Sequence, residues 1–362
     1  MLFATVSIIC IIAFQIVHFH YLLALQQSSL QELHNANQAS TQDEGPDRKT
    51  HSRRSRAPFS LWSIRLPGLI AACLLVAVQL LSKSDDVLTN CFIRAAFTFY
   101  ALKLLDLALA RAEQPPTKLT TGTGGKREPA SMTTTKDKWL YTWSLMSEMR
   151  YHSFDIVVQQ KGRHAESTSA ATAAAWTYGP CLVLPTLAYA VPTPYTKVLA
   201  LLLIIQLALE GVHTVMHPHC PHRLFHRPWA ATSINEFWST HWHACASPFL
   251  RSLAFKPAQR CVTPVFGKDA GNAAGVLAAF CLSGIWHGWT GAPLSISPWF
   301  GVQIWAVFMA MGVGCLLERQ IWAVRQGRML QRVCVWMYVI ASAGWCWKTL
   351  EQTSTLAWLR LE

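Results

Sequence analysis

The sequence is poor in charge, because only 14% of its 362 residues are charged, against about 25% in an ordinary soluble domain. None of its 11 cysteines forms a CxxC pair, so neither a zinc finger nor a disulfide framework is indicated. No repeat of fixed period is present, which argues against a solenoid or a duplicated transporter half. The low share of charged residues argues against a soluble enzyme.

Apolar residues are abundant instead: they make up 52% of the chain, with 16 Trp and 16 Phe, and the mean hydropathy is +0.23. So much aromatic surface must be buried in protein or lipid, which argues against a disordered chain. Candidate spans for a bilayer core of about 30 Å lie at 2–25, 61–82, 91–110, 177–192, 196–216, 270–289, 298–317 and 333–348. The sequence therefore predicts an all-α, polytopic transmembrane helix bundle of about eight spans.

Basic residues alternate between the predicted loops. The loops 27–60, 111–176 and 217–260 are basic, whereas 83–90 holds one lysine and 290–297 holds no basic residue. Because Lys and Arg concentrate in cytoplasmic loops, we expect both termini to be lumenal in a multi-pass protein of the endoplasmic reticulum. The formal charge is +12, but its Lys and Arg residues lie between apolar runs, and no basic and aromatic stripe indicates a nucleic-acid partner.

Composition divides the chain into five segments. They are a transmembrane anchor at 1–26, a basic polar loop at 27–60, a transmembrane pair at 61–110, a low-complexity cytosolic linker at 111–140 and a motif-bearing domain at 141–350. The polar, Ser- and Thr-rich stretches 35–58 and 113–138 predict no regular structure.

One predicted span carries a polar stripe. Gln206, Glu210, His213 and His217 recur at i, i+4, i+7 and i+11, so a helix places them on one face. That face should point into the protein, because ionisable groups facing lipid are costly. Two interpretations stay open, a functional site and hydrogen bonding between helices.

Histidine is concentrated in one stretch. His213, His217, His219, His222, His226, His241 and His243 make up half of the 14 histidines. A membrane di-iron oxygenase needs several HxxxH and HxxHH boxes, and this sequence has His213-x-x-x-His217 but no His-His pair. Zinc would lack a second cluster of ligands. We expect no metal, and keep the His-rich di-iron oxygenase as a less favoured alternative.

The first informative motif is 233–243, a polar and aromatic segment in a predicted cytoplasmic loop. On an α-helix, Trp238 and Trp242 would stack at i, i+4, while Glu236 and His243 share another face. Such a helix would dock its aromatic rings and present Glu236 and His243 to a cavity. The alternative is an interfacial helix with an aromatic belt.

The second motif is 280–291, in which His287 interrupts an apolar span between Gly284 and Gly288. Ser283 and Gly284 precede the histidine by one turn, so we expect the imidazole to be open to an approaching group on that side. A structural histidine is the alternative, but packing alone would favour filling that space.

Together the motifs resemble those of the wax synthase-like branch of the membrane-bound O-acyltransferases, which includes plant wax ester synthases and fungal terpenoid acetyltransferases. The resemblance rests on the order and spacing of Phe237-Trp238-x-x-x-Trp242-His243 and Ser283-Gly284-x-x-His287, and it reaches from about 222 to 348. It implies that 141–350 is a wax synthase-like acyltransferase domain. Asn235 and Ser239-Thr240 depart from the family, which usually has basic residues or glycine there.

The resemblance implies an acyl-CoA-dependent O-acyltransferase. His287 would be the catalytic base, His243 would orient or polarise the reactants, and Glu236 is the third catalytic candidate. The residues expected to contact the substrates are Phe237, Trp238, Trp242, Ser283 and Gly284. The residues that could meet the phosphates of coenzyme A are Arg251, Lys256 and Arg260, unless these only obey the positive-inside rule. No nucleophile elbow is present, which favours direct transfer over an acyl-enzyme.

For the substrates we expect acetyl-CoA as co-substrate, with no permanently bound cofactor, and a lipophilic alcohol such as a terpenoid or meroterpenoid of secondary metabolism. Bulky tryptophans beside both motifs would shorten an acyl channel. A long-chain wax ester synthase is the alternative, and a transporter or receptor without chemistry is a third class. Membrane lipid is the expected surrounding partner, and the oligomeric state is left open.

Overall fold

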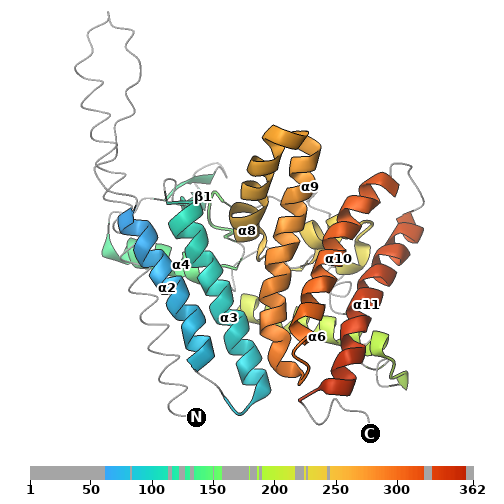
Figure 1. Cartoon of the computed structure of the whole chain (residues 1–362). Coiled ribbons are helices and arrows are strands. Elements are labelled where there is room, and N and C mark those ends of the chain that lie inside the picture. Colours follow the sequence, from blue (N-terminus) through green and yellow to red (C-terminus); the bar gives the residue numbers. More distant parts are fainter. Residues whose placement is uncertain are drawn as a thin grey trace, which may run out of the picture. The chain divides into compact units, whose positions relative to one another are not determined.

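The structure is a computed structural model (Figure 1). It describes residues 62–81, 84–112, 116–121, 127–130, 134–149, 151–156, 179, 186, 190–216, 224–225, 227–242, 245–321 and 328–355. The described part is mostly helical. Two compact units are present: the first comprises 1–82, 100–147 and 153–155, and the second comprises 83–99, 148–152 and 156–362. The predicted anchor 1–26 and the basic loop 27–60 lie outside the described residues.

The first unit is built on helix α2 (Trp62–Leu81) and the π-helical turn η1 (Asp106–Ala110) that follows helix α3 (Val87–Leu105). α2 packs on η1. Gly68 makes this approach possible, because a Cβ there would clash with the side chain of Ala108. A small residue at a helix crossing lets the two backbones come close, as is common between membrane helices.

The segment 111–140, which composition predicts to be a linker, contains regular structure. Strands β1 (Leu119–Thr121) and β2 (Arg127–Pro129) pair antiparallel, with Leu119 opposite Pro129. Helix α4 (Thr135–Ser147) follows. Its last turn is capped by Lys103, a fully buried side chain whose Nζ donates to the carbonyls of Leu145 and Met146 at 2.8 and 3.0 Å. These bonds satisfy carbonyls that a helix end leaves without partners.

The second unit contains four long helices: α6 (Pro194–Met216), α9 (Lys256–Gly291), α10 (Phe300–Ile321) and α11 (Arg328–Thr353). α9, α10 and α11 lie side by side in this order, and α6 packs against α11 (Figure 1). Shorter helical turns join them: η2 (Pro228–Ala230), α7 (Ile234–Glu236), η3 (Phe237–His241), α8 (Ser247–Leu250), η4 (Arg251–Phe255) and η5 (Ala292–Leu294).

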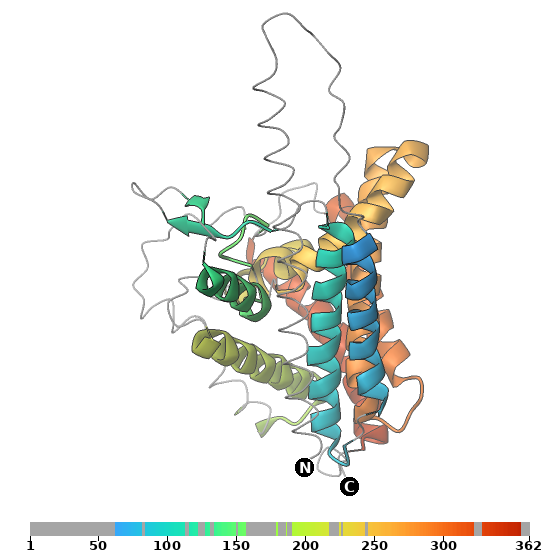
Figure 2. The same ribbon diagram turned by 90° about the vertical axis from the view of Figure 1, so that its left-hand side faces the viewer.

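Helix α9 is a hairpin of two arms, 256–266 and 268–291, because Gly267 breaks it with φ 83° and ψ 173°. Only glycine adopts this backbone conformation without strain. Gly275 lets the arm 268–291 pack closely, since a Cβ there would lie 2.8 Å from the ring of Phe255. The turn of the hairpin lies beyond the ends of α10 and α11 (Figure 1 and Figure 2).

Three helices of the described part are long and apolar enough to cross a membrane: α6, the 300–319 stretch of α10 and the 329–353 stretch of α11. They coincide with the predicted spans 196–216, 298–317 and 333–348, and they make the chain an integral membrane protein. The predicted spans 61–82, 91–110 and 270–289 are helical in the structure but do not meet the same criteria of length and hydropathy. The spans 2–25 and most of 177–192 lie outside the described residues, so the total of eight stays a prediction.

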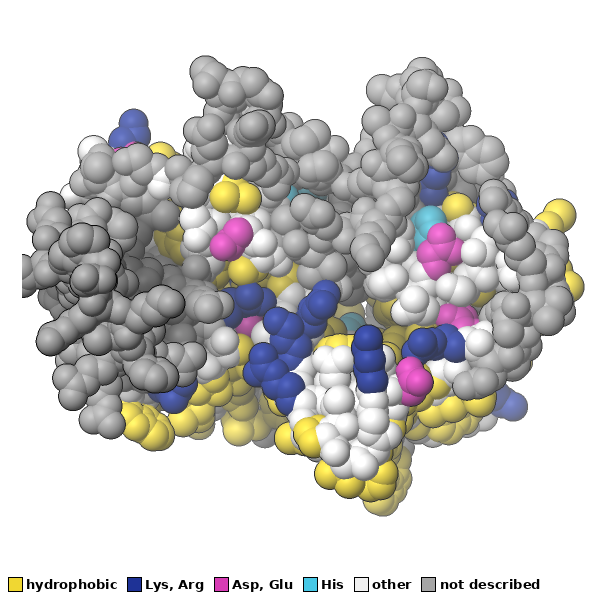
Figure 3. Space-filling view, turned by 90° about the horizontal axis from the view of Figure 1, so that it is seen from above, with side chains coloured by type: hydrophobic (Ala, Val, Ile, Leu, Met, Phe, Trp, Pro, Cys, Tyr) yellow, Lys and Arg dark blue, Asp and Glu magenta, His cyan; other side chains and the backbone are white. Residues whose placement is uncertain are grey.

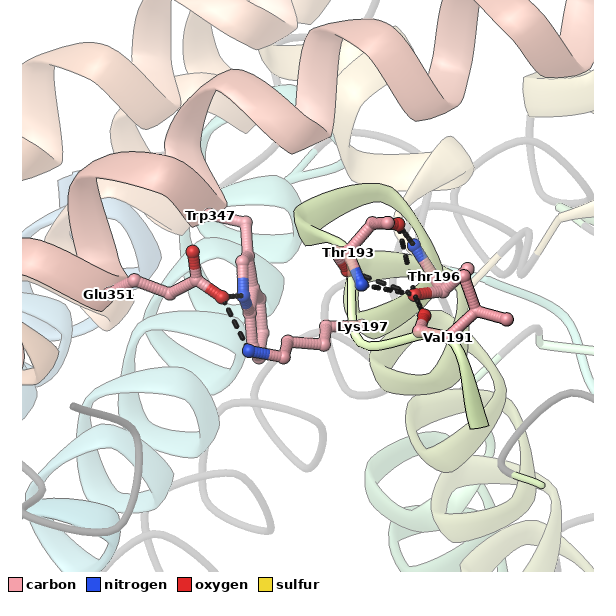
Figure 4. A network of polar contacts seen from close by, with 6 residues as sticks. All are labelled: Val191, Thr193, Thr196, Lys197, Trp347 and Glu351. Atoms are coloured by element: carbon pink, nitrogen blue, oxygen red, sulfur yellow. Dashed lines mark hydrogen bonds and ion pairs between the residues drawn. The ribbon is translucent and has the colours of Figure 1, made fainter. Parts of the chain in front are cut away.

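The first turn of α6 is fixed by polar contacts (Figure 4). Thr193 and Thr196 cap the helix reciprocally, because each hydroxyl accepts from the other residue's backbone N–H, at 3.2 and 3.0 Å. Lys197 then reaches α11, where its Nζ lies 2.7 Å from Glu351 Oε1. The Nε1 of Trp347 donates to the same oxygen at 2.9 Å. These contacts join α6 to α11 at the end where α6 begins.

Candidate active site

His287 lies on the second arm of α9, and its ring is enclosed by aromatic side chains. The imidazole stacks on Phe308 of α10, with ring centroids 4.3 Å apart and an interplanar angle of 29°. The ring of Trp286 lies 5.0 Å away. Its nitrogen Nδ1 is 2.8 Å from the backbone carbonyl oxygen of Ser283, one turn earlier in the same helix.

This hydrogen bond sets the tautomer of the neutral imidazole. A carbonyl oxygen can only accept, so Nδ1 must carry the proton that is shared with Ser283. The lone pair of the neutral ring is then on Nε2, which makes this nitrogen the one able to accept a proton. Ser283 therefore orients His287 through its backbone rather than through its hydroxyl.

The glycines around His287 do not leave the open space that the sequence suggested. A Cβ at Gly284 would lie 3.0 Å from atoms of both Trp305 and Phe308, and a Cβ at Gly288 would clash with the carbonyl of Gly301. Helix α10 fills the side that was expected to be free. The glycines serve close helix packing, the role of small residues in membrane bundles, so the expected substrate contact of Gly284 has no support in this geometry.

The two motifs meet through Phe308. Trp238 of the first motif lies 5.7 Å from Phe308, whose other neighbour is His287 of the second motif. Trp238 also meets Phe280 on α9, at 6.0 Å between ring centroids. Tertiary packing thus brings together two motifs that lie about forty residues apart in the chain. Sequence reasoning missed Phe308, because a single phenylalanine in an apolar helix carries no signal.

The first motif is not a plain α-helix, so its predicted register is wrong. Residues 237–241 form a π-helical turn in which Trp242 N–H bonds to the carbonyl of Phe237 at 2.7 Å. This i to i+5 spacing stacks Phe237 on Trp242, at 5.4 Å and 19°, whereas Trp238 and Trp242 are 6.4 Å apart and tilted by 73°. One extra residue in the turn shifts each side chain around the axis, and such turns are frequent at functional sites.

Phe237 and Trp242 belong to a buried aromatic and aliphatic core rather than to an exposed face. Both side chains are at most 4% exposed. Phe237 makes an edge contact with Trp336 of α11, at 5.5 Å. Trp238 is only partly buried at the edge of this cluster. Of the three aromatic residues expected to contact substrate, Trp238 is therefore the best placed.

Glu236 contacts His241 and Thr232. Its Oε1 lies 3.2 Å from His241 Nε2, and its Oε2 accepts from the backbone N–H and the hydroxyl of Thr232 at 2.8 and 2.7 Å. The bond from His241, with those from Thr232, lowers the pKa of the Glu236 carboxyl to about 2. The sequence predicts that Glu236 and His243 share one helix face, which is presented to a cavity. His243 lies outside the described residues.

Residues 234–241 of the first motif form a short helix, the motif helix, which begins after a capping residue, Ser233. The hydroxyl of Ser233 accepts from the backbone N–H of Glu236 at 2.9 Å, as an N-terminal serine commonly does. Glu318 of α10 accepts from the backbone N–H groups of Ile234 and Asn235, at 2.5 and 2.7 Å. No feature of the sequence singles out Glu318.

The polar stripe of α6 points into the protein, as predicted. Gln206, Glu210 and His213 are at most 4% exposed; His217 lies outside the described residues. Glu210 Oε2 accepts from the backbone N–H groups of Leu224 and Phe225, at 3.0 and 3.3 Å. These bonds favour the hydrogen-bonding interpretation for Glu210.

Within the described residues, no group of three or more His, Cys, Asp or Glu side chains could hold a metal ion. Histidines 217, 219, 222, 226 and 243 lie outside that part of the chain. The basic residues Arg251, Lys256 and Arg260 are all exposed at the start of the α9 hairpin. Figure 3, which views the molecule from above, shows exposed Lys and Arg side chains at this end.

Residues 220–310 match the membrane bound O-acyl transferase family. This range includes both motifs and stops before Glu318. No solved structure matches the chain.

Two curated relatives come from Arabidopsis thaliana. Probable long-chain-alcohol O-fatty-acyltransferase 2 is 30% identical over 127 residues, which cover 34% of this chain and 36% of that protein. Probable long-chain-alcohol O-fatty-acyltransferase 1 is 39% identical over 64 residues, which cover 18% of this chain and 19% of that protein. The chain thus spans about a third or less of the length of the curated relatives that it matches.

Proposed function

We propose that the protein is a membrane-bound O-acyltransferase, which moves an acyl group from a coenzyme A thioester to the hydroxyl of a lipophilic alcohol at His287. The observation that carries the proposal is the 2.8 Å contact between His287 Nδ1 and the Ser283 carbonyl, which leaves Nε2 as the basic nitrogen. The family match over 220–310 and the names of the curated relatives support the same reaction class.

The proposed reaction is a direct transfer. Nε2 of His287 takes the proton of the acceptor hydroxyl, while the oxygen of that hydroxyl bonds to the carbonyl carbon of the thioester. The carbon–sulfur bond then breaks, and the thiolate leaves with the proton that the imidazolium returns. General base catalysis of this kind contributes about 10²–10⁴-fold to a rate, and His243 is proposed to polarise the carbonyl oxygen.

Glu236 is proposed to support this site without exchanging protons. A carboxyl with a pKa of about 2 is a weak base at neutral pH. Its contacts with His241 and Thr232 instead fix the first motif. Arg251, Lys256 and Arg260 are proposed to bind the phosphates of coenzyme A, since all three cations are exposed near this motif, and Arg and Lys are the usual partners of phosphate.

For the substrates, we favour acetyl-CoA with a terpenoid or other lipophilic alcohol. The rings of Phe308 and Trp286 lie within 5.0 Å of the imidazole, between ring centroids, and bulky walls this close leave little room for a long acyl chain. The second candidate is long-chain wax ester synthesis, which the printed names of the Arabidopsis relatives favour.

The test uses microsomes that express the full chain. Radiolabelled acetyl-CoA and palmitoyl-CoA are each offered with a terpenoid alcohol and with a fatty alcohol, and microsomes with His287→Ala serve as the control. Acetyl transfer to the terpenoid alcohol is the expected result. Dominant palmitoyl transfer to the fatty alcohol would establish the second candidate, and no transfer from either donor would overturn the proposed function.

A further inference from the structure

A carboxylate outside both motifs contacts the first of them. Glu318 lies near the end of α10 and is 6% exposed. Both of its oxygens are used: Oε2 accepts from the backbone N–H of Ile234 at 2.5 Å, and Oε1 from that of Asn235 at 2.7 Å. These are the first two backbone N–H groups of the motif helix, which have no partner inside the helix.

A carboxylate at this position interacts favourably with the N-terminus of the motif helix. The N-terminus of a helix carries a partial positive charge, and an acidic group beside it is stabilising. The motif helix spans only residues 234–241, and a helix this short is not stable alone in water. Its position must therefore come from tertiary contacts, and its first turn is held by the packing of the buried Ile234 side chain and by the bonds to Glu318.

The same helix that carries Glu318 also touches His287. Phe308, ten positions earlier on α10 and about 15 Å along its axis, stacks on the imidazole and contacts Trp238 of the motif helix. α10 thus holds the motif helix at two places, at its first turn through Glu318 and at Trp238 through Phe308. Two attachments fix both the position and the orientation of the motif relative to His287.

We propose that Glu318 is a positioning residue, which clamps the first turn of the motif helix to α10 and so sets Trp238 against the site of His287. Its effect on transfer rests on the proposed function, whereas the clamp itself does not. Loss of the clamp should lower kcat and leave KM for the acyl donor nearly unchanged, because the bonds of Glu318 go to backbone N–H groups of the motif helix.

The test compares Glu318→Gln with Glu351→Gln. Glu351 on α11 also accepts from a lysine and a tryptophan, so its variant loses the same charge away from the motif helix. We expect Glu318→Gln to speed hydrogen exchange of the Ile234 and Asn235 amides by about tenfold or more. We expect kcat to fall by about 10- to 100-fold, the cost of misplacing a group by about 1 Å. Glu351→Gln should change neither quantity.

Glu318→Asp provides the second variant in case Glu318→Gln is not recovered as folded protein. It keeps the charge but is shorter by one methylene, so we expect kcat between those of wild type and Glu318→Gln. The pH profile of kcat should keep its midpoints in both variants, because the base is unchanged. Two results for Glu318→Gln would overturn the proposal. One is hydrogen exchange of the amides of residues 234–235 at the wild-type rate, and the other is kcat within twofold of wild type. If the wild type transfers no acyl group, the proposed function fails and the exchange comparison alone judges the clamp.

Discussion

His287 and His241 are held in opposite ways. His287 shares its Nδ1 proton with a neutral carbonyl and lies between aromatic rings, at 4.3 and 5.0 Å. His241, on the π-helical turn of the first motif, has its Nε2 3.2 Å from the carboxylate of Glu236. Both side chains are largely buried, so exposure does not distinguish them.

The difference lies in the group that each ring nitrogen contacts. A neighbouring carboxylate stabilises a protonated imidazole, whereas aromatic rings and a carbonyl give the charged form no counter-ion. A base must be neutral before it accepts a proton, so the environment of His287 suits that role. The contact of His241 with Glu236 suits a role in holding the motif together. Four substitutions test this distinction.

The largest effect should come from His287→Ala, which removes the proposed base. We expect acyl transfer to fall by about 10²–10⁴-fold, measured with the donor and acceptor that the wild type uses best. Expression and membrane insertion should persist, because an alanine inserts into a span more readily than a histidine. Retention of more than a tenth of wild-type activity, with normal gel filtration of the extracted protein, would reject His287 as the base.

Gly288→Ala disturbs the helix that carries His287 without touching the first motif. The new Cβ would clash with the carbonyl of Gly301 on α10, so the two helices must separate. We expect the free energy of unfolding to fall by about 1–3 kcal/mol, as for other overpacked sites, measured by thermal unfolding in detergent. Gly211→Ala is the matched control, since nothing lies within 4 Å of its added Cβ. Equal thermal midpoints for the two variants would contradict the tight approach of α9 and α10.

His241→Gln replaces the imidazole that contacts Glu236 and keeps a side chain of similar size. Because Glu236 is partly exposed, with 38% of its side chain accessible, such a pair contributes little on its own. We expect activity to fall by less than about tenfold, measured as kcat at neutral pH. A loss as large as that of His287→Ala would mean that His241 takes part in the reaction.

Glu236→Gln should have the smallest effect, and it should depend on pH. The pKa of Glu236 is lowered from its usual 4.5 to about 2 in the folded protein. The stability that its charge supplies is therefore complete above about pH 4.5 and is lost as the pH falls towards 2. Thermal midpoints of wild type and Glu236→Gln should differ at pH 6 and converge near pH 2. A difference that stays constant across this range would show that the charge of Glu236 has no part in it.

Three of the predicted spans and the burial of the α6 stripe followed from the sequence for the same reason. Each depends on the sign and period of hydropathy along one helix, which do not require knowledge of its neighbours. The prediction for Glu210 worked in this way: its spacing from Gln206 and His213 placed all three on one face, and that face is buried.

The register of the first motif could not be predicted, because a π-helical turn has no composition of its own. The choice of an i to i+5 bond from Trp242 to Phe237 depends on packing around both rings. The same limit explains the error about the glycines. Gly284 and Gly288 are compatible with an open face and with a close neighbour, and only the position of α10 selects between them.

Hydropathy along the chain was enough to predict a helical membrane protein, and the spacing of the two motifs predicts His287 as the catalytic base. Tertiary structure alone decided which groups surround that histidine. Neither Phe308 nor Glu318 belongs to a sequence motif. They contact His287 and the motif helix because α10 packs beside α9 and the motif helix. Hydropathy is a local property, whereas contacts between residues far apart in sequence arise from how the helices pack.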